Sequence, residues 1–150
     1  MRDPLPNGFD LAVSMDTSFG YFDSDDDESV LAGLHAALEP GGRLLLDVLA
    51  RDGFLDDASP RYWRELAGGE LLLLDRTFKV ATSRLHVDAL IVDGDGSRHA
   101  QAFEYRLYTL TELYRMLERA GFAVLQAWGG FDGAPPSPQR ARQVVLAERA

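Results

Sequence analysis

Short apolar runs alternate along this chain with segments of helical periodicity. Phe9 to Met15 is mostly apolar and predicts a strand buried on both faces. Ser24 and the acidic residues after it are typical of a helix start, and apolar residues then recur at helical spacing from Val30 to Leu38. Pro40-Gly41-Gly42 ends that helix, and Arg43 to Leu49 predicts a second buried strand. This order favours two parallel strands joined by a right-handed crossover.

The middle of the chain has a different pattern. Pro60 to Leu66 indicates a short helix or an irregular segment. Three strands are predicted after it, over Glu70–Val80, Ser83–Val92 and Arg98–Leu107. Asp93-Gly94-Asp95-Gly96 is a strong hairpin signal, because glycine accepts the positive φ that such turns require. We therefore expect an antiparallel insert over about residues 67–108, lying beside the parallel sheet.

The last third returns to alternating helix and strand. Thr109 and Glu112 fit a capping box, and Gly121 stands where a helix would end. Phe122 to Trp128 and Gln143 to Ala147 predict two further strands. The whole pattern predicts one α/β domain over residues 1–150. It should have a mixed sheet, helices covering the faces of that sheet, and an antiparallel layer at the carboxyl edge.

Composition narrows the classes of function. The chain has 150 residues, 46% of them hydrophobic, so it can bury a core as one domain. Its net charge of −9 disfavours a nucleic-acid binder, which needs a basic surface. It has no cysteine, and its three histidines lack the spacing of metal ligands, so no metal site is expected. No apolar run is long enough to cross a membrane, and we expect a cytoplasmic protein.

Several local motifs resemble those of one enzyme family. They are Phe9-Asp10-Leu11-Ala12-Val13, the Leu-x-Pro-Gly-Gly element from Leu38 to Gly42, and Ala120-Gly121-Phe122. Met1 to Pro6 and the loop Ser18-Phe19-Gly20-Tyr21-Phe22 add to them. Taken in order, over nearly the whole chain, these motifs resemble the C-terminal half of a class I S-adenosylmethionine-dependent methyltransferase. The last loop is similar to that of a bacterial small-molecule subgroup.

The resemblance implies a partial Rossmann-like fold and S-adenosylmethionine as cofactor. It also implies a missing part, because the family binds its cofactor with a glycine-rich turn after its first strand, and nothing before Phe9 supplies one. Asp93-Gly94-Asp95-Gly96 is no substitute, since it joins antiparallel strands and opens no helix. We expect a start assigned at an internal methionine, a truncated gene, or a partner that supplies the rest.

The resemblance also assigns the candidate residues. Those matching cofactor-contacting positions of the family are Arg2, Ser14, Met15, Asp16 and Phe19. Two alternatives stay open here: Met15 and Phe19 could belong to the core, and Arg2 could fray with the terminus.

Asp47 ends the second buried strand and is the best-placed carboxylate to act on an acceptor, although it could instead pair with Arg51 at the surface. The candidates for contact with the acceptor are Tyr21, Tyr62, Trp63, Arg76 and Tyr105. Packing or a dimer contact is the alternative role for the residues of the insert.

The favoured function is methyl transfer to a small-molecule O or N acceptor. Such a reaction is an in-line displacement in which the protein orients the acceptor and accepts a proton. One alternative is an inactive truncated remnant, or a subunit that forms a homodimer or binds a partner through the insert or through an unpaired edge at Phe9–Met15. An unrelated nucleotide-binding α/β domain is a third interpretation.

Overall fold

The computed structural model describes residues 6–22, 24–56 and 59–150. The chain divides into two compact units. The first comprises Met1–Asp57 and Leu107–Ala150, and the second comprises Ala58–Arg106. The second unit corresponds to the predicted insert, but it begins earlier than residue 67.

The first unit is built on a four-stranded sheet in the order β1-β2-β8-β7. Its strands are β1 (Phe9–Ser14), β2 (Leu38–Leu49), β7 (Phe122–Trp128) and β8 (Arg142–Arg149). β1 runs parallel to β2, whereas β8 is antiparallel to both of its neighbours, β2 and β7. The predicted α/β class and mixed sheet are confirmed.

Two long helices accompany this sheet. α1 (Ser24–Ala37) begins at the predicted serine and ends just before the Pro-Gly-Gly element. α3 (Leu110–Arg119) starts with the predicted capping box: Glu112 N donates to Thr109 Oγ1 at 3.2 Å, and Thr109 N donates to Glu112 Oε2 at 2.8 Å. A short helix, α2 (Arg51–Asp56), was not predicted, because six residues are too few to show a period.

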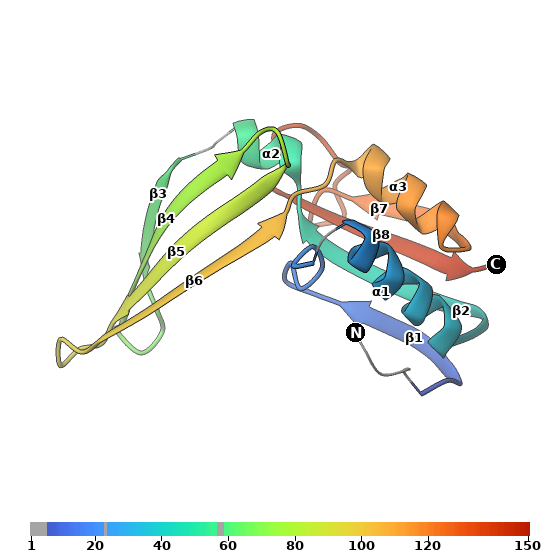
Figure 1. Cartoon of the computed structure of the whole chain (residues 1–150), viewed down its shortest axis with the longest axis horizontal. Coiled ribbons are helices and arrows are strands. Elements are labelled where there is room, and N and C mark those ends of the chain that lie inside the picture. The colour runs from blue at the N-terminus through green and yellow to red at the C-terminus, as the bar shows by residue number, and fades with distance from the viewer. Residues whose placement is uncertain (1–5, 23, 57–58) are drawn as a thin grey trace. The chain divides into compact units, whose positions relative to one another are not determined.

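The core of the first unit lies between its sheet and these helices. α1 and α3 lie side by side over the same face of the sheet (Figure 1). Apolar side chains of that face and of the two helices form one buried cluster, which includes Leu31, Leu44, Leu46, Leu113, Leu117, Val145 and Ala147. The apolar residues that recur at helical spacing in the sequence form the stripe of each helix that packs against the sheet.

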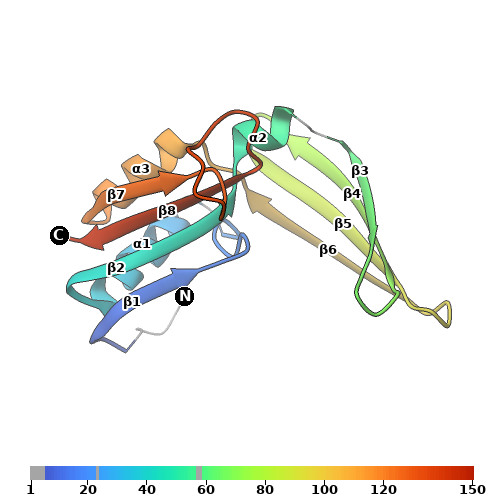
Figure 2. The ribbon, with the colours of Figure 1, turned by 180° about the vertical axis from the view of Figure 1, so that it is seen from behind.

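The opposite face of this sheet is nearest the viewer in Figure 2, where both long helices lie behind the strands. Phe9, Leu11 and Val13 of β1 are 46%, 55% and 53% exposed. Two predictions are therefore wrong: β1 is not buried on both faces, and the long helices cover one face only. An apolar run shows that a strand can be buried, but only the rest of the fold decides whether something lies over it.

The second unit is an antiparallel sheet in the order β3-β4-β5-β6. Its strands are β3 (Arg61–Glu65), β4 (Leu71–Lys79), β5 (Arg84–Val92) and β6 (Arg98–Arg106). The last three and the hairpin after β5 confirm the prediction; Gly96 has a φ of +86°, and its amide donates to Asp93 O at 2.9 Å. β3 corrects the expectation of a helix or irregular segment. All five of its residues are exposed, so pairing with β4 forms this strand and no local pattern announces it.

Two polar residues of α1 are buried or partly buried. His35 is partly buried with its ring edge-on to Phe122 at 5.2 Å between centroids. Asp27 is completely buried, whereas its neighbours Asp25 and Asp26 are exposed. Within the described residues, no helix is long and apolar enough to cross a membrane.

Candidate functional site

The end of β1 carries a strained turn at the carboxyl edge of the parallel strand pair. Asp16 and Thr17 have φ values of +55° and +59°, in the left-handed region that side-chain-bearing residues seldom adopt. Each such residue costs about 1–3 kcal/mol and persists only where its surroundings hold it in place. Two in succession, one of them β-branched, make this turn the best candidate for a functional loop in the first unit.

Backbone and side-chain groups of β2 hold the turn in that conformation. Asp16 N donates to Asp47 Oδ2 at 2.8 Å, and Thr17 N donates to Asp47 O at 3.1 Å. In return, Leu49 N donates to Thr17 Oγ1 at 3.0 Å. Asp47 therefore joins the ends of the two parallel strands through both its backbone and its side chain.

Arg142 of β8 completes this arrangement. Its Nε lies 2.9 Å from Asp47 Oδ1, an ion pair without hydrogen-bond alignment, and its Nη2 donates to Asp16 Oδ1 at 2.7 Å. The Asp47 side chain is 1% exposed and that of Arg142 35%, so water reaches only one member of the pair. The guanidinium also lies 5.0 Å from the centroid of the Phe131 ring. A buried carboxylate is tolerated here because a cation and an amide surround it.

The predicted Asp47–Arg51 surface pair is wrong, since Asp47 is buried and Arg142 is its partner. Asp47 lies two residues before the end of β2, close to where the sequence placed it, and its contacts are those of a residue that positions the β1 turn. Direct action of Asp47 on an acceptor stays a prediction.

A second buried polar group lies at the start of α1. Tyr108 Oη donates to Asp27 Oδ2 at 2.6 Å, and Gln143 Nε2 donates to the Tyr108 carbonyl at 2.7 Å. The Tyr108 ring lies 5.7 Å from that of Phe19, which is only 3% exposed. These contacts join α1, β8 and the segment two residues before α3, next to the aromatic Phe19.

The structure brings most of the cofactor candidates together. Ser14 Oγ lies 3.1 Å from Ser18 Oγ, Met15 is 38% exposed, and Asp16 follows them in the strained turn. Met15 is therefore not a core residue. Phe19 takes the alternative role, inside the core. Arg2 lies outside the described residues.

Tyr21 continues this loop and is 42% exposed. Partial burial, with Asp16 nearby, raises the pKa of its hydroxyl above the usual 10.0. Tyr21 is therefore a neutral phenol at physiological pH, able to donate a hydrogen bond to a ligand but poorly suited to accept a proton.

The remaining acceptor candidates belong to the second unit, and its sheet separates them. Side chains alternate between faces along a strand, so Tyr62 lies on one face and Trp63 on the other. Arg76 shares the face of Tyr62, with its guanidinium 5.7 Å from the centroid of that ring. Tyr105 is on the same face and stacks on Phe103 at 6.0 Å. The sequence named these residues as one group, but Trp63 does not belong with the others.

The sequence reasoning missed Arg142, which contacts the strained turn, and Thr17, which lies within it. It also missed the buried group of Asp27, Tyr108 and Gln143. The members of each group come from distant parts of the chain, and nothing in their local pattern marks them. Among residues 6–22, 24–56 and 59–150, no three His, Cys, Asp or Glu side chains lie close enough together to hold a metal ion.

Comparison of the coordinates with solved structures identifies the fold. The CcbJ methyltransferase from Streptomyces caelestis matches 96% of this chain with a TM-score of 0.82 and 16% identity. An S-adenosylmethionine-dependent methyltransferase from Clostridium acetobutylicum matches 96% with a TM-score of 0.83 and 16% identity. CalS10, an amino pentose methyltransferase from Micromonospora echinaspora, matches 97% with a TM-score of 0.70 and 20% identity.

The chain has a Rossmann-like methyltransferase fold. It spans 58%, 59% and 60% of the lengths of those three proteins, so it corresponds to part of each. The sequence itself matches no protein-family model and no curated protein sequence. In this methyltransferase fold, the strained turn lies at the carboxyl edge of parallel strands, where open α/β sheets bind their ligands.

Proposed function

We propose that this chain is part of an S-adenosylmethionine-dependent methyltransferase that acts on a small molecule. The observation that carries the proposal is the strained turn at Asp16–Thr17, held by Asp47 and Arg142 at the carboxyl edge of a methyltransferase fold. Strain of this kind is retained where geometry matters for a ligand. The choice of cofactor is supported by two solved structures of similar fold: one is named an S-adenosylmethionine-dependent methyltransferase, and CalS10 is named as bound to S-adenosylmethionine.

The residues of the β1 turn fit one end of that cofactor. The Ser14 hydroxyl and the carboxylate of Asp16 offer hydrogen-bond acceptors for an ammonium group, and Met15 offers an exposed apolar surface. Bound there, S-adenosylmethionine would supply an electrophilic methyl group at a sulfonium. Within residues 6–22, 24–56 and 59–150, no glycine-rich turn joins a parallel strand to a helix, so the adenosine end of the cofactor needs residues from elsewhere.

We infer that the chain acts as the C-terminal half of the complete site. The exposed apolar face of the sheet and the outer edge of β1 offer a place for further parallel strands and covering helices. A preceding segment of the same polypeptide, or a partner subunit, would supply the remainder. Two observations support this: within the part of the chain that the structure describes, β1 pairs with β2 alone, and the chain spans about 60% of the length of CalS10.

The acceptor we propose carries an amine or hydroxyl nucleophile. Among the solved structures of similar fold, CalS10 is named an amino pentose methyltransferase and KedS8 a sugar N-methyltransferase. An acidic chain suits a cationic amine better than a polyanion. An amine on a small, polar molecule is the first acceptor class to test.

The decisive experiment uses the protein isolated from its source. Its intact mass is measured first, and binding of S-adenosylhomocysteine is then measured by calorimetry. We expect a mass above the 16.6 kDa of this chain, or a copurifying subunit, together with saturable binding. Asp16→Ala should weaken binding, whereas Asp132→Ala, in an exposed pair with Arg140, should not. Absence of binding by the native protein would refute the proposal.

The second candidate is a protein without catalysis. A mass of 16.6 kDa, no copurifying subunit and no cofactor binding would favour an inactive remnant or a binding subunit. The outer edge of β1 is the observation that favours this alternative: no described residue pairs with it, and an unpaired edge is a template for association.

A further inference from the structure

One face of the antiparallel sheet in the second unit forms an open groove. The groove has a volume of about 600 Å³ and is floored by Leu73, Leu90, Ala100 and Ala102. Trp63 stands at its edge and is 70% exposed, a large apolar surface for a soluble unit to leave in water. The side chains of Asp75 and Asp88, in the cross-strand row next to that of Trp63, are 56% and 67% exposed. The groove is thus too open to enclose a small ligand as binding pockets do.

The strand register arranges this face in rows that cross all four strands. One row contains Trp63, Leu73, Leu90 and Ala100, and the row beside it contains Glu65, Leu71, Val92 and Arg98. Residues directly opposite each other on antiparallel strands point to the same face. Leu71 and Leu73 are 39% and 40% exposed, so both rows offer apolar surface at their centres.

We propose that two copies of this chain pair face to face through these rows. A two-fold axis along the strands, between β4 and β5, places β3 of one copy over β6 of the other. It sets Trp63 over the small Ala100, and Leu73 over Leu90. Sheets packed in this way lie about 10 Å apart, a gap that an indole facing a methyl group fills.

The same operation gives complementary charge at the rim. Glu65 of each copy comes over Arg98 of the other, and Leu71 comes over Val92. A contact in which each patch meets its own counterpart closes as a dimer and does not extend into a fibre. A single two-fold axis therefore places a large side chain against a small one, apolar side chains against apolar ones, and an acidic side chain against a basic one.

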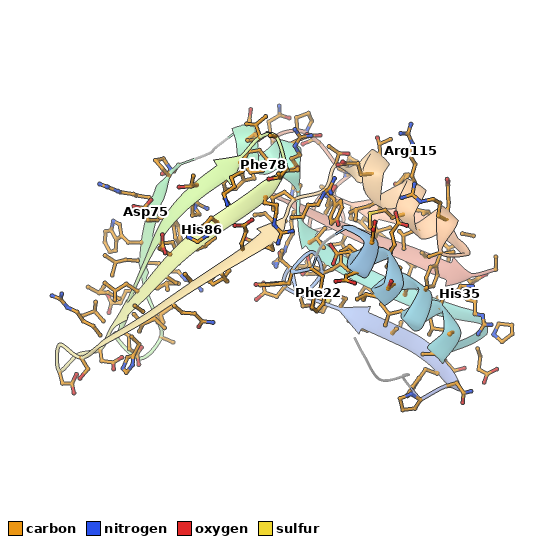
Figure 3. The ribbon with its side chains drawn as sticks, viewed as in Figure 1. Phe22, His35, Asp75, Phe78, His86 and Arg115 are labelled. Atoms are coloured by element: carbon orange, nitrogen blue, oxygen red, sulfur yellow. The ribbon has the colours of Figure 1, made fainter. Side chains whose placement is uncertain are left out.

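Like charges meet at two places on this face: in the acidic row, and where Lys79 of one copy comes over Arg84 of the other, although both of these cations pair with Glu104 of their own chain. Asp75 of one chain approaches Asp88 of the other, as their positions on β4 and β5 require (Figure 3 labels Asp75). Arg61 lies 3.5 Å from Asp75 and supplies a compensating cation at that end. Arg61→Ala should consequently weaken the dimer while leaving each copy folded, because the Arg61 side chain is 86% exposed.

The test is sedimentation velocity of the full chain over a concentration series. We expect a mass that rises toward twice 16.6 kDa, and Trp63→Ser should weaken association at least about tenfold, as for a central interface tryptophan. Val80→Ser is the matched control, since Val80 is 72% exposed in the turn after β4, outside the groove. Far-UV circular dichroism checks that both variants fold.

Reversing the charges at the rim tests whether this face, and not another surface of the chain, forms the dimer interface. Glu65→Arg and Arg98→Glu should each weaken the dimer, and the double variant should restore it, because the two residues meet only across the axis. A chain that stays monomeric throughout overturns the proposal. So does a dimer that survives Trp63→Ser and both single reversals but dissociates on Leu11→Glu, which would place the contact on the exposed sheet face of the first unit.

Discussion

Replacement of Asp47 tests the account of the strained turn most directly. Asp47→Ala removes the acceptor of the Asp16 amide and the anion beside Arg142. Breaking a buried ion pair from one side costs about 3–5 kcal/mol. The Arg142 side chain is 35% exposed, so water recovers part of its solvation, and we expect about 2–3 kcal/mol. That is a large fraction of the total free energy of unfolding of a typical domain, which is about 5–15 kcal/mol.

Asp47→Asn separates the charge from the hydrogen bond. The amide oxygen of asparagine still accepts from Asp16 N, so only the charge-assisted part is lost, and we expect about 1–2 kcal/mol. Glu148→Ala is the control, because the pair of Glu148 with Arg43 is exposed and 3.5 Å long, and such pairs contribute below about 1 kcal/mol.

The measurement is urea unfolding followed by tryptophan fluorescence. The chain has two tryptophans, Trp63 in the second unit and Trp128 in the first. In a Trp63→Phe background the signal comes from Trp128 alone, so it reports the first unit, which contains Asp47. If Asp47→Ala costs no more than Glu148→Ala, the turn is held by other contacts and the reasoning fails.

Three further predictions follow from local geometry. A methyl group on Gly42 would lie 2.8 Å from a backbone oxygen, so Gly42→Ala should lower the melting temperature, whereas Gly94→Ala, with no atom within 4 Å, should not. Thr109→Ala removes the capping box of α3 and should cost about 1 kcal/mol by urea unfolding; an unchanged midpoint would contradict that geometry. The pKa of Tyr21 is raised in the folded state. The contribution of its neutral hydroxyl to the free energy of unfolding is therefore fully present below the unfolded pKa of 10.0, and it is lost as the pH rises through the folded pKa. Tyr21→Phe should therefore reduce the alkaline loss of stability, measured by unfolding on both sides of that pH.

The order and type of most elements could be predicted from local pattern. The helix from Ser24, the capped helix after Thr109 and the hairpin at Asp93–Gly96 all form as expected. Their signals are caps, turns and periodicity, which depend on residues a few positions apart. The same locality explains why the exposed strand β3 was missed: its partner supplies the pairing, and its own residues carry no apolar alternation.

The candidate site could be predicted only in part. Ser14, Met15 and Asp16 were proposed because they match family positions at the end of a predicted strand, and Asp47 because it lies near the end of the next one. Arg142 was not found, although it contacts two of these residues, because more than a hundred positions separate it from Asp16.

The sequence by itself determined most of the strands and helices, apart from β3 and α2, since these elements follow from short-range spacing. The tertiary structure alone decided that Asp27 is buried while its neighbour Asp26 is exposed. It also decided that one face of the apolar strand β1 is left exposed, and that the rings of Tyr62 and Trp63 lie on opposite faces of their sheet. Those outcomes depend on what packs over a residue. Asp27 is buried because Tyr108, far along the chain, donates to it, while Leu11 is exposed because the helices lie on the other face. Whether a residue is buried depends on the helices and strands that pack over it, and a short stretch of sequence around that residue does not contain them.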